Sequence, residues 1–342
     1  MTRTRIAVIG AGNWGRNHVR TIAGMTDAEL FAVCDTDEAR RDQLARQYPG
    51  TRIVEEPAAA FAGADAVVVA TPAATHAAVA LEALDEGIPV LIEKPLALSV
   101  ADAERVVERS ARRGVPVLTG HLLLFHPAVE FLRGVIASDE LGHLHYLYSQ
   151  RVNLGQVRQD ENALWSFGPH DVSVAMYLTD ERPNRVTAHG RSYLQPGVED
   201  VVFLTLEFAS GIMVHVQMSW LDPHKERRLT VVGSRKMAVF DDMQAREKVK
   251  VYDKGIDRPP EYGSYGESLA VREGDIWIPR IPNVEPLRAE LEHFVEVARR
   301  TAEPRAPASD GLEVVRVLDA ASASLADRGR TVELDTMEVR SP

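Results

Sequence analysis

A glycine-rich turn near the start of the chain constrains the fold more than any other stretch. The apolar run 6–9 precedes it, as expected of a strand buried on both faces of a parallel sheet. Gly10, Gly12 and Gly15 follow in the spacing G-x-G-x-x-G, which suits a tight turn, close approach of the backbone to a pyrophosphate, and close helix–strand packing. A helix beginning near Asn13 would direct its free N–H groups at that pyrophosphate.

An acidic residue at a suitable distance strengthens this motif. A second apolar run, 30–34, ends in Asp35, which lies 20 residues after Gly15. An acid at this point accepts hydrogen bonds from the ribose hydroxyls of a dinucleotide and repels a 2′-phosphate. We therefore predict a site for NAD rather than NADP, although Arg40 and Arg41 on the following helix could reach a phosphate. A glycine-rich turn without a ligand is the alternative.

Length and composition limit the remaining possibilities. The 342 residues exceed one ordinary core, so we predict two domains, 1–120 and 121–342, whose C-terminal helices could pack back on the first. A formal net charge of −11 argues against a nucleic-acid-binding face. We expect no signal peptide, no membrane span and no metal site, and we place the protein in the cytoplasm. Cys34 is the only cysteine, which excludes an internal disulfide, and we expect it to be a small core residue.

The first domain alternates strands with helices. Apolar runs at 52–54, 64–70, 89–92 and 115–118 are separated by the helical patterns 36–48, 76–86 and 96–113. This order predicts right-handed βαβ units and a parallel sheet, whose ligands lie beyond the carboxyl ends of the strands. That rim comprises Gly10 to Trp14, Asp35, Thr71-Pro72 and Glu93-Lys94-Pro95.

The Glu93-Lys94-Pro95 motif is the candidate for proton transfer. A lysine at a strand end that faces a bound nicotinamide is placed to exchange a proton with a substrate hydroxyl, and burial and neighbouring charges could bring its pKa towards neutrality. Pro95 fixes the backbone and could follow a cis bond. The alternative is a surface lysine paired with Glu93.

The second domain shows strands of a different kind. Residues 143–154, 201–208, 212–220 and 228–240 alternate with period two, which predicts an antiparallel sheet. Phe203 and Met213 would lie on the face opposite Val202 and Val214, which leaves apolar side chains on both faces; one face packs on its own helices and the other needs a partner. We expect a homo-oligomer, a tetramer or a dimer, formed through the open face. Residues 255–286 are expected to be an irregular excursion, and 287–300 and 310–327 to be helices joined by a linker, with Ser309 or Asp310 as the second cap.

A stretch rich in polar groups precedes an apolar helix expected at 172–178. We expect His170 and Asp171 at the start of that helix and an uncompensated charge at Arg158. A histidine that merely caps the helix or packs in a corner is the alternative. Our candidate substrate-binding residues are Asn153, Arg158, Asn162, Trp165 and Asp171.

The order of these motifs resembles the glucose–fructose oxidoreductase / inositol dehydrogenase / MocA (Gfo/Idh/MocA) family. The features that carry the resemblance are the glycine turn, the acid, Thr71-Pro72 with a downstream His76, Glu93-Lys94-Pro95, Gly120-His121, Phe125-His126-Pro127 and the Gly-Pro-His-Asp run that ends at Asp171. The resemblance implies an α/β protein, with an N-terminal Rossmann fold and a C-terminal α/β domain containing a large, mostly antiparallel sheet. It also implies an NAD-dependent oxidoreductase that acts on a hydroxyl of sugars, inositols or nucleotide sugars.

The resemblance implies catalytic roles for Lys94 and His170. The cofactor contacts that we expect are Gly10, Gly12, Asn13, Trp14, Asp35, Thr36, Thr71, Pro72, His76, Glu93, Lys94 and His121. The stretch 160–165 and the loop 274–279 resemble a nucleotide-sugar 3-dehydrogenase branch, which suggests oxidation of UDP-N-acetylglucosamine or UDP-glucose at C3. Arg158 and the long loop could then meet the diphosphate.

Two positions depart from the common family pattern. Ser166 stands where many relatives have an aspartate four residues before the histidine, and Leu124 stands where many have an arginine before the phenylalanine. Asp171 or Glu161 could supply the missing carboxylate. A dehydrogenase of a free sugar or inositol, and a non-catalytic regulator that senses NAD, remain the alternatives.

Overall fold

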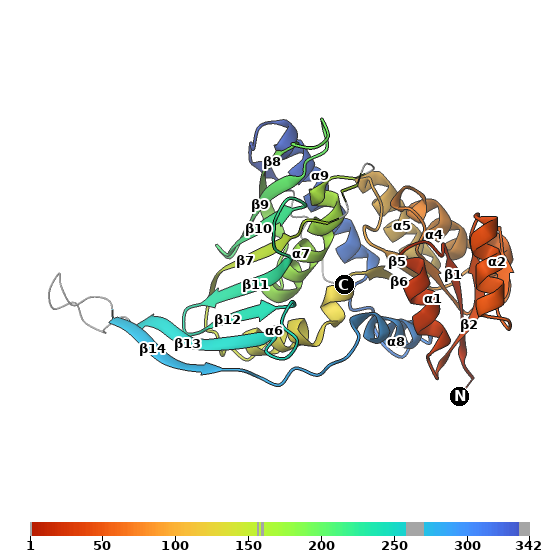
Figure 1. Cartoon of the computed structure of the whole chain (residues 1–342), viewed down its shortest axis with the longest axis horizontal. Coiled ribbons are helices and arrows are strands. Elements are labelled where there is room, and N and C mark those ends of the chain that lie inside the picture. Colours follow the sequence, from red (N-terminus) through yellow and green to blue (C-terminus); the bar gives the residue numbers. More distant parts are fainter. Residues whose placement is uncertain (1, 156, 159–160, 258–269, 335–342) are drawn as a thin grey trace. The chain divides into compact units, whose positions relative to one another are not determined.

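Figure 1 shows a computed structural model of the chain, which describes residues 2–155, 157–158, 161–257 and 270–334. The chain divides into two compact units. The first contains the residues up to Phe125 together with Val284–Arg316, and the second contains His126–Asn283 together with the residues after Arg316. Within the described residues, no helix combines the length and apolar character that crossing a membrane would require.

The first unit contains a six-stranded parallel sheet. Its strand order is β3 (Arg52–Val54), β2 (Ala28–Cys34), β1 (Thr4–Ile9), β4 (Ala66–Val69), β5 (Val90–Glu93) and β6 (Val117–Gly120). The connecting elements are α1 (Gly15–Ala23), α2 (Glu38–Gln47), α3 (Pro57–Phe61), η1 (Ala73–Thr75), α4 (His76–Asp85), α5 (Val100–Arg113) and η2 (Leu122–Phe125), followed much later by α8 (Pro286–Ala298). The order reverses between β1 and β4, which confirms the predicted Rossmann fold.

Burial and capping explain these elements. β4 and the β1 residues from Ile6 onwards are buried, as central strands of a parallel sheet must be. The Asp37 carboxylate caps α2 and the Ser99 hydroxyl caps α5, so these helices begin at Glu38 and Val100. The predicted starts at 36 and 96 are therefore wrong. Cys34 is buried as expected, and its burial raises the pKa of the thiol to about 11.

The segment between α8 and the next helix is not a plain linker. The Ala306 carbonyl accepts a hydrogen bond from the Thr119 amide (2.8 Å), and Pro307 forms an antiparallel bridge with Leu118. The segment therefore runs along β6, at the edge of the parallel sheet.

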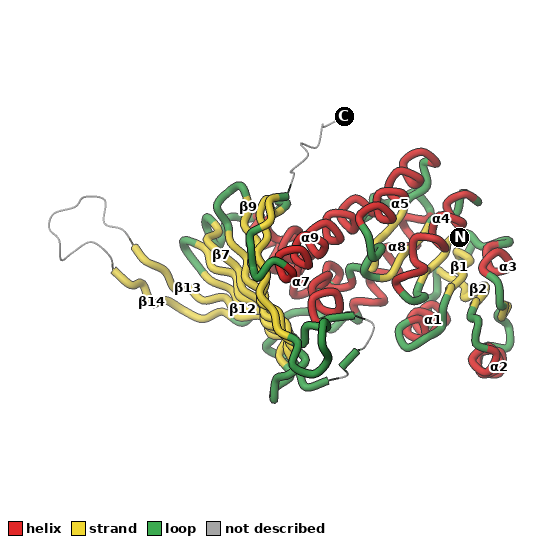
Figure 2. Tube along the Cα trace, turned by 90° about the horizontal axis from the view of Figure 1, so that it is seen from above, coloured by secondary structure: helices red, strands yellow, loops and turns green. Residues whose placement is uncertain are grey.

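The second unit contains a nine-stranded sheet. Its order is β14 (Ala270–Trp277), β13 (Val249–Asp257), β12 (Met237–Asp241), β11 (Glu226–Gly233), β7 (Leu144–Val152), β10 (Met213–Ser219), β9 (Val201–Phe208), β8 (Pro183–Arg191) and β15 (Val332–Glu333). Every pair is antiparallel except β7 with β10, which confirms the mostly antiparallel sheet. The helices α6 (Pro127–Ala137) and α7 (Ala163–Thr179) also belong to this unit, and α7 lies against β7, β9 and β10 (Figure 2).

Three expectations for this part of the chain are wrong. The alternating segment 228–240, expected to be one strand, forms two strands, β11 and β12. The excursion expected at 255–286 contains the end of β13 and all of β14, which pair with each other (Figure 1). Charged residues such as Lys254 and Glu273 hide the alternation, and a sheet edge tolerates such residues. Residues 258–269 of that excursion lie outside the described part. Finally, α9 (Ala308–Ala326) begins before Asp310, which lies in its first turn instead of capping it.

Candidate active site

The glycine turn at the end of β1 has room for a ligand. Gly10 adopts a φ of +88°, and a Cβ atom there would lie 2.8 Å from the Ala70 carbonyl group. A Cβ at Gly12, by contrast, would meet nothing within 4 Å. The helix α1 begins at Gly15, slightly later than expected, and no side chain caps its first turn. Open space beside Gly12 and an uncapped helix N-terminus fit a pyrophosphate group.

Asp35 closes the end of β2. Its carboxylate accepts hydrogen bonds from the backbone N–H groups of Ala11 (2.8 Å) and Asp37 (3.0 Å) and from the Arg40 guanidinium. Burial alone would raise the pKa of Asp35, but these hydrogen bonds outweigh it and lower the pKa. The Asp35 carboxylate is therefore held in its ionised form at the end of β2.

Glu93 connects the glycine turn to the lysine. Its Oε1 atom accepts a hydrogen bond from the Trp14 indole and lies 2.6 Å from His18 Nε2, while its Oε2 atom accepts the backbone N–H of Lys94 (3.1 Å). Burial would raise the pKa of Glu93, but the hydrogen bond and charge of His18, followed by the Lys94 charge, lower it. Because Glu93 is buried, the alternative of a surface Lys–Glu pair does not describe this motif.

The neighbouring loops hold Lys94 at the rim. The Lys94–Pro95 peptide bond is cis, as the sequence allowed. The buried His76 ring lies between two backbone carbonyls, with Nδ1 2.8 Å from Pro95 O and Nε2 2.9 Å from Thr71 O. His76 thus ties the loop after β4 to the loop after β5.

His121 is a buried polar group with unused hydrogen-bonding capacity. It is 1% exposed, and neither ring nitrogen has a hydrogen-bond partner among the described residues. Burial lowers the pKa of His121 to about 4. The negative charge of Glu93 acts to raise this pKa, and the positive charge of Lys94 acts to lower it. A neutral imidazole with orphaned nitrogens beside Lys94 fits a site where a polar group of a cofactor would complete the hydrogen bonding.

In the second unit, α7 carries most of the polar candidates. Asn162 caps this helix by accepting the Trp165 amide (3.1 Å), so the helix begins at Ala163 and not at 172. His170 and Asp171 therefore lie in the helix interior, not at its start. The Gly168-Pro169 pair lies inside the helix, where Gly168 allows the close approach of Leu318.

The two carboxylates that could replace the one missing at Ser166 are both engaged. Asp171 accepts hydrogen bonds from Ser149 Oγ and Arg151 Nε of β7, each 2.6 Å long. Glu161 forms an ion pair with Arg158 (2.8 Å), so the expectation that the Arg158 charge is uncompensated is wrong.

The remaining substrate candidates also have structural contacts. The Asn162 amide donates to Glu199 (2.7 Å), and the Trp165 indole donates to Ser322 Oγ (3.1 Å). The Asn153 backbone N–H donates to Ser219 O (3.1 Å) at the end of β7. All of these contacts lie within the second unit.

Sequence reasoning missed three residues. His18 follows Trp14 by one helical turn, a spacing that predicts a shared face. Arg305 lies over the Phe125 ring, 4.8 Å from its centroid, and donates to the Leu124 carbonyl (3.1 Å), so an arginine distant in sequence contacts the Leu124-Phe125 pair. Glu290 of α8 is fully buried, and a glutamate on an apolar helix face gave only a weak signal.

Comparison with known proteins decides the family. Residues 4–121 match the model described as an oxidoreductase family with an NAD-binding Rossmann fold, and residues 129–239 match the GFO/IDH/MocA C-terminal domain. The chain belongs to the Gfo/Idh/MocA family of NAD-dependent oxidoreductases. This confirms the resemblance and the cofactor predicted from the motifs.

Three proteins to which the chain is similar illustrate the range of similarity. Inositol 2-dehydrogenase 2 from Saccharopolyspora erythraea is 35% identical over 222 residues, which cover 62% of this chain but only 66% of that relative. UDP-N-acetylglucosamine 3-dehydrogenase from Acidithiobacillus ferrooxidans is 27% identical over 94% of this chain and 96% of its own length. The crystal structure of a candidate oxidoreductase from Magnetospirillum magnetotacticum is 32% identical, with a TM-score of 0.79, over 93% of this chain and 99% of that one.

Proposed function

We propose that this enzyme oxidises a secondary hydroxyl group of a sugar with NAD, most specifically C3 of a UDP-sugar such as UDP-N-acetylglucosamine or UDP-glucose. The single observation that carries the reaction type is the position of Lys94. It follows the end of β5 directly, its backbone N–H is held by Glu93, and the cis peptide to Pro95 follows it.

The residues of the first unit would hold the cofactor. The turn from Gly10 to Trp14 would receive the pyrophosphate, Asp35 and Thr36 the adenosine ribose, and the loops at Thr71-Pro72 and Glu93-Lys94 together with His121 the nicotinamide end. Bound NAD supplies the acceptor for the hydride that leaves the substrate carbon. Lys94 takes the proton of the same hydroxyl, and we assign His170 as its partner.

The substrate would be recognised by the second domain. We assign NAD binding to residues 1–120 and substrate binding and oligomerisation to residues 121–342. Asn153, Asn162, Trp165 and Asp171 would shape the sugar site, and Arg158 would exchange its ion pair with Glu161 for the diphosphate. The 27% identity to a UDP-N-acetylglucosamine 3-dehydrogenase over nearly the whole chain supports this substrate class.

A second candidate has its own support. The relative that is 35% identical over 222 residues is an inositol 2-dehydrogenase, which favours a cyclic polyol as substrate. Both candidates use the same Lys94 chemistry and differ only in the contacts of the second unit.

One assay separates these candidates from each other and from a regulator that binds NAD without catalysis. Purified enzyme is incubated with NAD and UDP-N-acetylglucosamine, UDP-glucose, myo-inositol, scyllo-inositol or glucose, and formation of reduced nicotinamide is followed by its absorbance. We expect turnover with a UDP-sugar. Turnover with an inositol alone would select the second candidate, and cofactor binding without turnover of any of them would contradict the proposed reaction.

We further propose that the enzyme works in the cytoplasm as a homo-oligomer, either a tetramer or a dimer. The support is the sheet of the second unit, where Tyr146, Phe203 and Met213 expose about two fifths or more of their surface while Val202 and Val214 are buried. Exposed apolar side chains on a sheet face are shielded from water when a second copy of the chain covers them.

A further inference from the structure

The Asp35 carboxylate has no acceptor capacity to spare in this structure. Its Oδ1 atom accepts the Asp37 N–H and Arg40 Nη1, and its Oδ2 atom accepts the Ala11 N–H and the same Arg40 nitrogen, at distances of 2.8–3.0 Å. A carboxylate offers about four lone-pair positions, so all of them are used. Two ribose hydroxyls cannot bind Asp35 unless one donor leaves.

Only Arg40 can leave without disturbing the backbone. The amide of Ala11 belongs to the glycine turn, and the amide of Asp37 belongs to the residue that caps α2. The Arg40 side chain, in contrast, is 39% exposed and has a second ion pair with the Asp37 carboxylate (3.4 Å). A displaced guanidinium therefore remains tethered beside the ribose position.

We propose that Arg40 sets the discrimination between NAD and NADP. It competes with the ribose of NAD for Asp35, and after displacement it pairs with the 2′-phosphate of NADP, which makes NADP a second, weaker cofactor. This inference rests on the proposed assignment of Asp35 to the cofactor ribose.

Charge explains why one residue affects the two cofactors in opposite directions. An isolated Asp35 carboxylate would repel a 2′-phosphate, but the Arg40 guanidinium offsets that repulsion and has the fork geometry that suits phosphate oxygens. Removing Arg40 leaves acceptor positions open for the hydroxyls of NAD and restores the repulsion against NADP.

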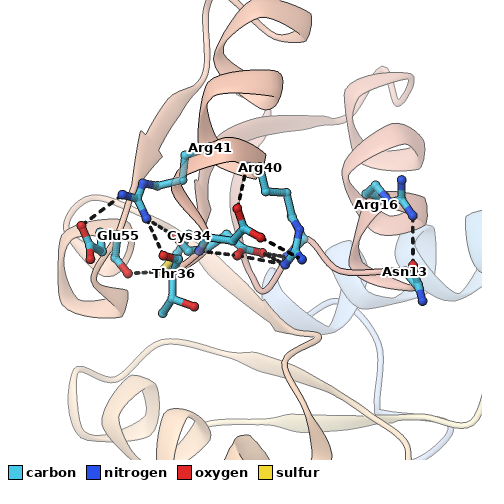
Figure 3. Close-up of polar contacts among 10 residues, drawn as sticks. Asn13, Arg16, Cys34, Thr36, Arg40, Arg41 and Glu55 are labelled. Carbon is cyan, nitrogen blue, oxygen red and sulfur yellow. Dashed lines mark hydrogen bonds and ion pairs between the residues drawn. The ribbon is translucent and has the colours of Figure 1, made fainter. Parts of the chain in front are cut away.

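Arg41 provides a matched control on the same helix. Its guanidinium donates to the carbonyls of Asp35 and Thr36 (2.9 Å each) and pairs with Glu55 (3.2 Å), and its side chain is only 19% exposed. Figure 3 shows Arg41 directed at Thr36 and Glu55 and the Arg40 guanidinium on the other side, towards Asn13. Arg41 is committed to these contacts and does not reach the Asp35 carboxylate.

The test is the affinity of the full-length protein for NADH and NADPH, measured by titration of the nicotinamide fluorescence. Relative to wild type, Arg40→Met should bind NADH about twofold to fivefold more tightly, as loss of a partly exposed ion pair predicts, and NADPH about tenfold more weakly. Arg40→Lys keeps the positive charge without the fork geometry of the guanidinium, so its affinities for NADH and NADPH should lie between those of wild type and Arg40→Met. Arg41→Met should leave the NADH/NADPH ratio within about a factor of two of wild type.

The outcomes are distinguishable. An NADH/NADPH ratio that is unchanged in both Arg40 variants, or equal losses for both nucleotides, would overturn the inference and leave the dehydrogenase proposal intact. Failure of the wild-type protein to bind NADH at all would overturn the cofactor assignment and the inference with it.

Discussion

Lys94 is the residue on which the proposed reaction depends. We expect Lys94→Met and Lys94→Ala to lower kcat by about 10²–10⁴-fold, the usual contribution of a general acid–base group. NADH binding should survive, because the proposed contacts to the pyrophosphate and the adenosine ribose lie on the glycine turn and Asp35, away from Lys94. Steady-state kinetics together with NADH titration measure both effects.

His170 tests the division of roles. His170→Ala should cost less in kcat and more in KM than the Lys94 variants, because the lysine follows the end of a buried strand directly and is held there by Glu93. Lys225→Met, at an exposed lysine of the second unit, is the control and should behave like wild type. A Lys94 variant with nearly full kcat beside an inactive His170 variant would show that the roles are reversed.

At the scale of the element, α8 carries an unusual buried acid. Glu290 has no exposed surface, and neither carboxyl oxygen has a hydrogen-bond partner among the described residues. Burial, and then the negative charge of Glu93, raise the pKa of Glu290 well above its ordinary value of 4.5. The side chain is therefore held in its neutral form beside an ionised Glu93.

This raised pKa makes stability depend on pH. Below pH 4.5, the ordinary pKa that Glu290 has in the unfolded chain, Glu290 is protonated in both the folded and the unfolded state, so its ionisation does not change the free energy of unfolding. Above it the unfolded chain releases the proton while the folded chain retains it, so the free energy of unfolding falls with rising pH until the folded pKa is reached. Glu290→Gln removes this loss. The stability of the variant relative to wild type should therefore be greater at about pH 8 than at about pH 5.

Thermal unfolding at the two pH values measures the effect. Glu296→Gln, an exposed change on the same helix, is the matched control and should show no comparable trend. An equal shift in Tm for Glu290→Gln at both pH values would mean that Glu290 is ionised in the folded protein or affects stability only through packing.

At the scale of the whole molecule, the open face of the nine-stranded sheet predicts assembly. Tyr146 and Met213 are direct partners on adjacent strands, and the Phe203 ring stacks on His215 with centroids 6.2 Å apart. Light scattering at micromolar concentration should give an oligomer for wild type, and smaller species for Phe203→Glu combined with Met213→Glu, because charges on this face oppose its burial. Tyr193→Ser, at an exposed tyrosine outside the strands, is the control. A monomeric wild type would refute the prediction.

The sequence by itself determined the features that depend on neighbouring residues. Local backbone geometry and hydrophobic periodicity were enough to predict the glycine turn, the acid after β2, the alternation of strands and helices in the Rossmann fold, and the lysine at the end of a strand. The alternation of Val202 and Phe203 between a buried and an exposed face was likewise readable, since successive side chains of a strand point to opposite faces.

Only the tertiary structure decided which polar groups meet. Glu93 contacts His18 across 75 positions of the chain, and Arg305 reaches Leu124 across 181. Arg40 is only five residues from Asp35, yet its bond to both carboxylate oxygens depends on how α2 is capped. The length of α7 was missed because Gly168 packs against Leu318, a residue distant in sequence, and this contact overrides local propensity. The β13–β14 pairing was missed because strands near the edge of a sheet tolerate charged residues that hide the alternation. Side-chain pairing and burial depend on chain closure over long distances, which local patterns do not encode.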